Sequence, residues 1–368
     1  MFIKTLELKD YRNYDMLSID FSDGINILYG DNAQGKTNIL ESIYISGTTK
    51  SHRSNKEREI IKLGKDESHI RMFVSRDNVI HKIDMHLKKN KPKGVAINGL
   101  AIKKSSELFG IVNIILFSPE DLSIIKNGPA ERRRFIDLEL CQLDKVYLYN
   151  LSNYNKIINQ RNNLLKQISF NPKLMDTLSI WDMQLVEYGS KIIERRKLFI
   201  DQLNEIVYDI HNKLSGNKEH LIINYEPNVL ANEFESKLKS TLQKDITLKL
   251  TNTGPHRDDI SFLNDTIDLR KFGSQGQQRT AALSLKLAEI ELVKKIIKDK
   301  PILLLDDVLS ELDRKRQNYL LNSIRDIQTI ITCTGLEEFI TNRLSLDKIY
   351  HVVNGTVTNE NNVTWDFQ

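Results

Sequence analysis

The sequence is poor in cysteine and in long apolar segments, and these shortages exclude several classes of protein. Its 368 residues include only two cysteines, Cys141 and Cys333, which cannot form a disulfide framework and fit a reducing cytosol. No apolar run approaches the roughly 20 residues of a membrane span. The first residues alternate like a strand, so we expect no signal peptide. The net charge of +4 is too small to indicate nucleic acid by itself. We therefore expect a cytoplasmic globular protein without membrane contact.

A glycine-containing loop between an apolar strand and a helix is the clearest motif. The stretch GDNAQGKT follows the apolar run at 25–28 and precedes a helical pattern, which matches G-x-x-x-x-G-K-[ST] in its strand–loop–helix context. Glycines let backbone N–H groups surround phosphate oxygens, and the helix N-terminus adds a positive dipole end. Lys36 can reach the β- and γ-phosphates, and the Thr37 hydroxyl can bind Mg²⁺. The predicted nucleotide-binding residues are Gly30, Asp31, Asn32, Ala33, Gln34, Gly35, Lys36, Thr37 and Asn38.

An apolar strand that ends in two adjacent carboxylates supplies the second half of such a site. The stretch PILLLDD occupies residues 301–307, and a solvated turn after a buried strand explains it poorly. In P-loop proteins one acid holds Mg²⁺ and another can polarise the attacking water. We assign Asp306 to the metal and Asp307 to the water. A β-branched strand at 329–334 ends in hydroxyls, and two interpretations stay open for it: an ordinary core strand or a sensor of the γ-phosphate.

A polar turn at a helix start, FGSQGQQRT at residues 272–280, carries no metal-ligand spacing and no nucleophile beside a base. Together with GDNAQGKTN, LLLDD and SELD it resembles the signature motif of the ABC-type ATPase superfamily. That resemblance implies that Ser274, Gly276 and Gln277 close over the γ-phosphate held by a partner's P-loop. ATP would then join two chains into a two-fold symmetric homodimer. Gln275 and Gly273 stand where that superfamily often has glycine and leucine, which puts the transporter branch in doubt.

The segment between Thr37 and Phe272 is too long for a minimal transporter ATPase and too short for the coiled-coil arms of chromosome-maintenance SMC proteins. The chain resembles the RecF family of bacterial DNA replication and repair proteins, which have an SMC-like ATPase head. The matching stretches are LKDYRNY (8–14), GDNAQGKTNILESIY (30–44), KSHR (50–53), FSPEDL (117–122), GPAERRRFID (128–137), TGPHRDD (253–259), GSQGQQRT (273–280) and LLLDDVLSELD (303–313).

The RecF resemblance implies a weak, DNA-stimulated ATPase that uses ATP and Mg²⁺ as a switch and dimerises on ATP. It also implies binding to duplex, gapped or junction DNA after DNA damage, a part in the SOS response, and cooperation with RecR and RecO in placing RecA. The implied catalytic residues are Lys36, Asp307, Ser274 and Gln277. Arg12 resembles a residue near the nucleotide in SMC-like heads, and Glu120 resembles a loop residue that couples Mg²⁺ to a second lobe.

Apolar residues spaced by threes, fours and sevens predict a helical hairpin between 151 and 210, broken at Asn171-Pro172. Arg195 fills the heptad position between Ile192 and Phe199. The hairpin either scaffolds the second lobe or grips DNA or a partner at its tip. We expect an α/β fold of the ABC/SMC-type head, with a mixed sheet around the P-loop and a mainly helical second lobe. The first lobe would use residues 1–118 and 297–368, and the second 119–296.

Basic residues gather in places that suggest backbone-directed binding to duplex DNA, because no aromatic stacking platform is visible. The candidates are Lys50, Arg53, Lys56, Arg132, Arg133 and Arg134. Arginines at a helix N-terminus oppose its dipole, so an anionic partner is expected: Glu131, Asp137 or a phosphate. The lysines at 88–93 are typical of a solvated hairpin turn. His256 is open between a hydrogen-bonded loop residue and a catalytic group.

A second class of function, the energising subunit of a membrane transporter, fits the ATPase motifs but predicts a head without the hairpin. A protein that shifts on DNA with ATP would favour the first reading. A nuclease-linked head is a third possibility, but the sequence shows no further metal-ligand cluster to support it.

Overall fold

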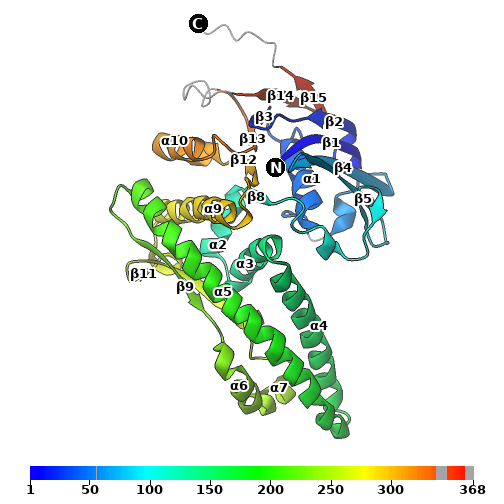
Figure 1. Ribbon diagram of the computed structural model, residues 1–368, viewed down its shortest axis with the longest axis vertical. Helices are drawn as coiled ribbons and strands as arrows, with labels where there is room; N and C mark the ends of the chain where they lie inside the picture. Colours follow the sequence, from blue (N-terminus) through cyan, green and yellow to red (C-terminus); the bar gives the residue numbers. More distant parts are fainter. Residues whose placement is uncertain (55, 337–345, 361–368) are drawn as a thin grey trace. The chain divides into compact units, whose positions relative to one another are not determined.

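The computed structural model describes residues 1–54, 56–336 and 346–360 and divides the chain into two compact units (Figure 1). The first unit comprises Met1–Glu120 and Val293–Gln368, and the second comprises Asp121–Leu292. The first is therefore built from both ends of the chain, with the second inserted between them. Among the described residues, no helix combines the length and apolar character that crossing a membrane requires.

An antiparallel sheet forms one layer of the first unit. Its order is β2-β1-β4-β5-β6-β7. Along β1, Ile3, Leu6 and Leu8 are buried while Glu7 and Lys9 lie on the opposite, exposed face, as expected for a sheet with one face in the core. The strands are β1 (Phe2–Tyr11), β2 (Tyr14–Asp20), β4 (Glu67–Arg76), β5 (Val79–Lys88), β6 (Gly94–Ile97) and β7 (Leu100–Ala101).

A second, mixed sheet of the first unit carries the P-loop. Its order is β15-β14-β3-β13-β12-β8, and every neighbouring pair is parallel except β14 and β15. The runs Ile302–Asp306 and Thr329–Cys333 are buried throughout, as expected for parallel strands covered on both faces. The strands are β3 (Ile25–Tyr29), β8 (Ile114–Phe117), β12 (Ile302–Asp306), β13 (Thr329–Cys333), β14 (Lys348–Val353) and β15 (Thr356–Asn359).

Helix α1 (Lys36–Thr48) contacts strands of both sheets, β4 and β5 on one side and β8, β12 and β13 on the other. Nearly all its side chains are buried, which is the pattern of a helix enclosed by the core. Gly47 permits close packing, since a Cβ there would collide with Ile114. The first unit also contains helix α10 (Arg314–Ser323) and 3-10 turns at Glu57–Glu59, Ser105–Glu107 and Leu309–Glu311, and the 3-10 turn Pro119–Asp121 spans the point where the chain passes into the second unit.

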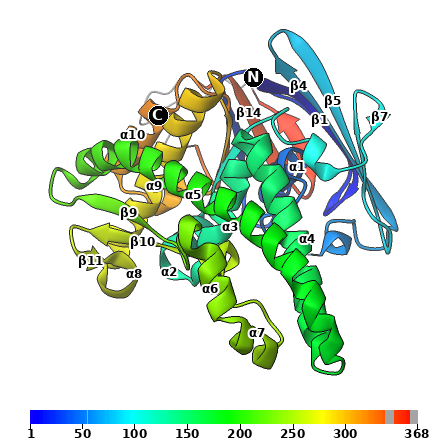
Figure 2. The ribbon, with the colours of Figure 1, turned by 60° about the horizontal axis from the view of Figure 1, so that its bottom comes forward.

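The second unit is dominated by the predicted helical hairpin, which the structure confirms. Helices α4 (Lys145–Ile168) and α5 (Leu178–Ser215) pack along each other (Figure 2). They are unequal: 24 and 38 residues. The buried heptad position is Arg196, which is 2% exposed, and not the predicted Arg195. Arg195 is half-buried and pairs with Asp144 instead.

Shorter elements surround the hairpin. Strands β9, β10 and β11 form an antiparallel sheet in the order β11-β10-β9, and α5 contacts β9. The remaining elements are α2 (Leu122–Lys126), α3 (Pro129–Leu143), β9 (Leu221–Glu226), α6 (Phe234–Ser240), α7 (Leu242–Leu248), β10 (Asp259–Asn264), β11 (Ile267–Asp268), α8 (Leu269–Phe272) and α9 (Gln275–Ile297), with 3-10 turns at Pro172–Thr177, Ala231–Glu233 and Pro255–Arg257. The predicted α/β fold with a mainly helical second part is confirmed.

Candidate nucleotide site and signature helix

The P-loop connects β3 to α1 and needs glycine at both of its ends. Gly30 has φ 148° and Gly35 has φ 114°, in a region that L side chains rarely adopt. A Cβ on Gly30 would collide with the Val352 carbonyl oxygen, and one on Gly35 would lie 2.5 Å from the Asn13 amide nitrogen. No side chain in the described part of the chain caps the start of α1. The first N–H groups of this helix are therefore left for an anion such as a phosphate.

Lys36 extends back across the loop. Its Nζ donates to the carbonyl oxygens of Gly30 (2.5 Å) and Asp31 (2.7 Å). Only 7% of the residue is exposed, and burial lowers its pKa, while the Asp307 carboxylate acts in the opposite direction. The ammonium is held inside the loop by neutral carbonyls. Charged phosphate oxygens are stronger acceptors, so the lysine can turn to them with little movement.

Three side chains meet where β12 and β13 end. Thr37 Oγ1 and Thr332 Oγ1 each donate to Asp306 Oδ1 at 2.8 Å. The Thr332 hydroxyl also accepts from the Asp307 N–H at 3.0 Å. Thr332 therefore positions both acids, a role that neither open interpretation of its strand had described. The Thr37 hydroxyl and the Asp306 carboxylate offer adjacent oxygen ligands, the kind that Mg²⁺ prefers, so these two residues could hold that ion.

Asp307 lies in a different environment from Asp306. Its backbone is left-handed, with φ 54°, and its side chain is half-buried. Burial raises its pKa, and the neighbouring Asp306 and Glu311 carboxylates raise it further, while Lys36 lowers it. A carboxylate with a raised pKa is a better base than an ordinary aspartate. The Asp307 carboxylate therefore has the character required to polarise an attacking water.

Asn13 is a contact of the P-loop that sequence reasoning missed, although it lies inside the quoted LKDYRNY stretch. Its Nδ2 donates to the Gln34 carbonyl at 3.1 Å, and its Oδ1 accepts from Asn38 Nδ2 at 2.8 Å. The predicted nucleotide residue Arg12 turns elsewhere: Nε and Nη2 bind the two oxygens of the buried Glu41 carboxylate on α1, at 2.8 and 2.6 Å. Arg12 anchors the helix, while its neighbour anchors the loop.

Glu120 follows the edge strand β8. Parallel pairing sets Phe117 opposite Leu305, so the turn at Pro119–Asp121 leaves the sheet at the edge where Asp306 lies. The side chain of Glu120 is exposed. Its assignment to the metal stays a prediction.

The signature turn of the second unit is closed by its own side chains. The Ser274 N–H donates to Gln277 Oε1 at 2.9 Å, and the Gln277 N–H donates to Ser274 Oγ at 3.2 Å. This reciprocal pair is a capping box at the start of α9, a reading of S-x-x-Q that the sequence analysis did not consider. Gln277 Nε2 also binds Glu219 at 3.0 Å. The Ser274 hydroxyl keeps its own proton, so it can still donate to an anion.

Gly276 has no internal reason to be glycine. A Cβ on it would have only Ser274 Oγ near it, at 3.9 Å, and its φ is not left-handed. Gly276 is exposed, like Ser274 and Gln275. A residue without a side chain at this position leaves the helix start accessible to another molecule.

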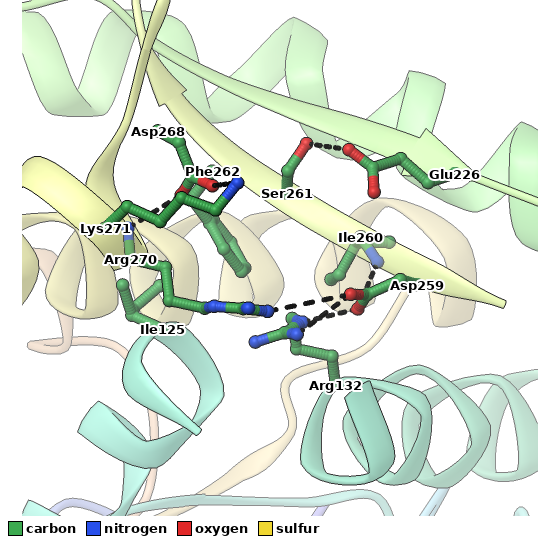
Figure 3. Close-up of a pocket in the computed structure, with 10 residues that line it drawn as sticks. All are labelled: Ile125, Arg132, Glu226, Asp259, Ile260, Ser261, Phe262, Asp268, Arg270 and Lys271. Atoms are coloured by element: carbon green, nitrogen blue, oxygen red, sulfur yellow. Dashed lines mark hydrogen bonds and ion pairs between the residues drawn. The ribbon is translucent and has the colours of Figure 1, made fainter. Parts of the chain in front are cut away.

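The arginine run at the start of α3 corrects one prediction. Arg132 is 1% exposed, and its Nε and Nη2 bind both oxygens of Asp259 at 2.6 and 3.0 Å. This pair lines a pocket of about 190 Å³. Figure 3 shows Arg270 approaching the same carboxylate. Neither Glu131 nor Asp137 is its partner, and a buried, fully paired arginine is not available to DNA. Arg133 is half-buried and donates to the Asp258 carbonyl at 2.6 Å, and Arg134 is exposed.

The other predicted DNA residues lie on the surface of the first unit. Lys50, Arg53 and Lys56 are all exposed. Lys56 lies 3.7 Å from Glu59 in an exposed pair. Arg53 Nη1 donates to Asn38 Oδ1 at 3.0 Å, so this arginine borders the P-loop helix.

His256 has a structural role in the second unit. Its Nε2 donates to the Thr251 carbonyl at 3.0 Å, and its Nδ1 lies 2.7 Å from the Tyr154 hydroxyl, which donates to it. Burial lowers the pKa of His256 to about 4, so the ring is neutral. Both ring nitrogens are used, which favours the loop interpretation over a catalytic one.

Comparisons with known proteins extend over nearly the whole chain. The family model for the RecF/RecN/SMC N terminal domain matches residues 2–358. A DNA replication and repair protein RecF from Lachnoclostridium phytofermentans is 67% identical over 357 residues, covering 97% of this chain and 99% of that one. Its counterpart from Lachnospira eligens is 62% identical over 363 residues, covering 98% and 100%.

Solved structures agree with these relatives. The recombination mediator protein RecF with ATP, of the RecFOR pathway, superposes with a TM-score of 0.91 at 35% identity, covering 98% of this chain and 97% of that one. A Pyrococcus furiosus Smc head is 17% identical with a TM-score of 0.57, covering 98% and 96%, and shows the fold alone. The resemblance drawn from the motifs is confirmed, and the chain belongs to the RecF family of DNA replication and repair proteins.

Proposed function

We propose that this protein is an ATP-dependent DNA-binding protein that dimerises on ATP, clamps DNA at gaps or stalled forks, and works with RecR and RecO in placing RecA. The observation that carries the proposal is the meeting of Lys36, Thr37, Asp306 and Asp307 at one end of the mixed sheet. The RecF structure with ATP supports it. We propose a cytoplasmic location, because the chromosomal DNA that the protein would bind lies there.

Different residues of the nucleotide site serve ATP binding and slow ATP hydrolysis. Lys36 and the open N–H groups of α1 hold the β- and γ-phosphates, and Thr37 and Asp306 hold Mg²⁺. Asp307 accepts the proton of the attacking water. Hydrolysis is weak, is stimulated by DNA and serves as a switch that releases the dimer.

The proposed dimer assigns a function to the signature helix α9. Ser274 and the accessible helix start at Gly276 would donate to the γ-phosphate held by a second copy of the chain, closing a two-fold symmetric interface. This accounts for a glycine that the chain's own packing does not require. The transporter alternative is not favoured, because the matching relatives are RecF proteins.

Light scattering with and without ATP tests the dimer. We expect the wild type to double its mass with ATP, and Ser274→Arg to bind ATP and stay monomeric because its bulk and charge block the helix start. Ser236→Arg, at an exposed serine of α6 in the same unit, is the matched control and should dimerise. Normal dimerisation of Ser274→Arg would contradict the role given to the signature helix.

Fluorescence anisotropy across a salt series tests the DNA clamp. Each phosphate contact contributes about −0.9 to the slope of log K against log salt on duplex DNA. Two joined chains double the contacts, so ATP should steepen the slope. Neutralising Lys50, Arg53 and Lys56 should flatten it and weaken binding to unrelated sequences alike. Neutralising Lys89 and Lys91, on the predicted solvated turn, is the control. Equal slopes with and without ATP would contradict the clamp.

A further inference from the structure

Two histidines and a glutamate meet on the exposed face of the antiparallel sheet, in a place that no sequence spacing reveals. The register of β4 and β5 sets His69 opposite His86 and Glu67 opposite Lys88. Residues 67 and 69 share a face because successive side chains in a strand alternate. Ligand atoms of Glu67, His69 and His86 all lie within 4.8 Å of one another. The pairing of β4 with β5 thus brings His86 to Glu67 and His69, from which it is distant in the sequence.

Their geometry is close to that of a metal site. His86 Nε2 lies 3.0 Å from Glu67 Oε2, and His69 Nε2 lies 3.9 Å from Glu67 Oε1. The two imidazole rings stack with centroids 4.0 Å apart. Ligand atoms around a tetrahedral zinc ion, at bonds of about 2.0–2.1 Å, are separated by roughly 3.3 Å. Glu67 and His86 meet this spacing already, and His69, with 44% of its side chain exposed, has room to rotate by the remaining distance.

The chemistry of the trio selects a class of ion. Imidazole nitrogens suit Zn²⁺, Cu²⁺ and Ni²⁺, whereas Mg²⁺ and Ca²⁺ prefer oxygen. An imidazole binds such an ion through the lone pair of an unprotonated ring nitrogen, and both His69 and His86 offer one. Both histidines line a hollow of about 880 Å³ over this sheet face. A fourth ligand therefore has space to approach.

We propose that Glu67, His69 and His86 form a binding site for a transition-metal ion of the Zn²⁺ class, with three protein ligands and a fourth position open to the hollow. The ion would lie between His86 Nε2 and the Glu67 carboxylate, which are 3.0 Å apart. This site is distinct in chemistry from the Thr37 and Asp306 pair, which offers oxygen alone.

Lys88 provides an internal competitor. Its Nζ lies 3.1 Å from Glu67 Oε2, so the ammonium occupies an oxygen that the metal needs. The other charges on this face are largely committed: Arg71 pairs with Asp84 at 2.6 Å and with Glu7 at 3.3 Å. A divalent ion must displace the Lys88 ammonium, and removing that ammonium should tighten metal binding.

Calorimetric titration of the metal-free, nucleotide-free full chain with ZnCl₂ tests the proposal. We expect one ion per chain, at least about tenfold weaker binding in His69→Gln and in His86→Gln, and tighter binding in Lys88→Gln. His220→Gln is the matched control, since this histidine also lies 3.0 Å from an acid, Asp265, but has no second histidine in that pair. Co²⁺ bound by the wild type should show the intense visible absorption of a tetrahedral site.

Retained ATP binding will show that each variant is folded. Equal Zn²⁺ affinity in the wild type and the His69→Gln/His86→Gln double variant would overturn the proposal. Weaker binding in Lys88→Gln would also overturn it, because the lysine would then support the ion instead of competing with it.

Discussion

The two helix starts that carry the glycine motifs, α1 and α9, are built in opposite ways. Helix α1 begins after a left-handed Gly35, and within the described residues no side chain caps it. Helix α9 begins with a capping box in which Ser274 and Gln277 satisfy each other's N–H groups. The first has unsatisfied donors and a lysine folded over them. In the second, the Gln277 N–H of the first turn is already bonded to the Ser274 hydroxyl.

This difference separates two kinds of phosphate contact. A helix start with free N–H groups gains directly when an anion arrives, so the P-loop can bind nucleotide within one chain. A capped start gains less, since an anion must compete with the cap. The signature helix therefore needs a phosphate that is already fixed and charged, which is what a nucleotide held by another chain would provide.

Removing the lysine would have the largest effect, because it deletes the charge at the open helix start. Lys36→Met should weaken ATP binding by at least about tenfold, given roughly 1.5–3 kcal/mol for a charged hydrogen bond, and should abolish hydrolysis. Fluorescent-nucleotide binding and phosphate release would measure both. Lys91→Met, at an exposed lysine of the solvated turn in the same unit, is the control. Normal hydrolysis by Lys36→Met would remove the P-loop assignment.

Asp307→Asn would sharpen the comparison by separating ATP binding from ATP hydrolysis at the uncapped start of α1. A general base contributes about 10²–10⁴-fold, so hydrolysis should fall in that range while ATP binding and dimerisation persist. The base works only when ionised, and its pKa is raised. The wild-type rate should therefore fall, as pH drops, at a higher pH than the usual value of about 3.9 for aspartate.

The Asp307→Asn variant should lose this fall of the rate at low pH, the acid limb of the pH profile. Asp77→Asn, at a side chain that is 86% exposed, should keep both the rate and the limb. If Asp307→Asn retains the wild-type pH profile, another group is the base.

Breaking the capping box at the start of α9 should have the smallest effect, which we measure as stability of the nucleotide-free protein. Ser274→Ala removes the acceptor for the Gln277 N–H, which typically costs about 0.5–2 kcal/mol. Ser274→Thr keeps a capping oxygen and should lose less. Urea unfolding of the nucleotide-free protein would measure both. Equal stability of the alanine and threonine variants would show that the capping box contributes little.

Local motifs predicted the central residues of the site, whereas the sequence did not predict side-chain pairings that depend on tertiary packing. The P-loop and the LLLDD strand were found because each is a short pattern with one structural use. The arginine run at 132–134 was given Glu131, Asp137 or a phosphate as its partner, and the two acids were chosen because they are near in sequence. Arg132 pairs instead with Asp259, which is 127 positions away. No periodicity specifies such a pairing.

Helix phase and strand register also limited what the sequence could predict. The heptad count placed Arg195 in the hairpin interface, but helices have 3.6 residues per turn and the pattern drifts, so Arg196 is buried. The trio of Glu67, His69 and His86 depends on strand register, which pairs two separate segments. The capping box was present in the sequence and was overlooked because the family motif gave the same residues another meaning.

The sheet order has a consequence for how the protein is made. Strand β3 lies between β13 and β14, and the Ile25 N–H binds Asp347, 322 positions later. At roughly 5–20 residues per second, the ribosome needs about 15–60 s to reach that point. For most of this interval the apolar strand at Ile25–Tyr29 has neither neighbour, because β13 begins only at Thr329, while the inserted unit can fold as it emerges. An unpaired strand edge invites association with other chains, so the nascent chain is exposed to such association until β13 and β14 have emerged.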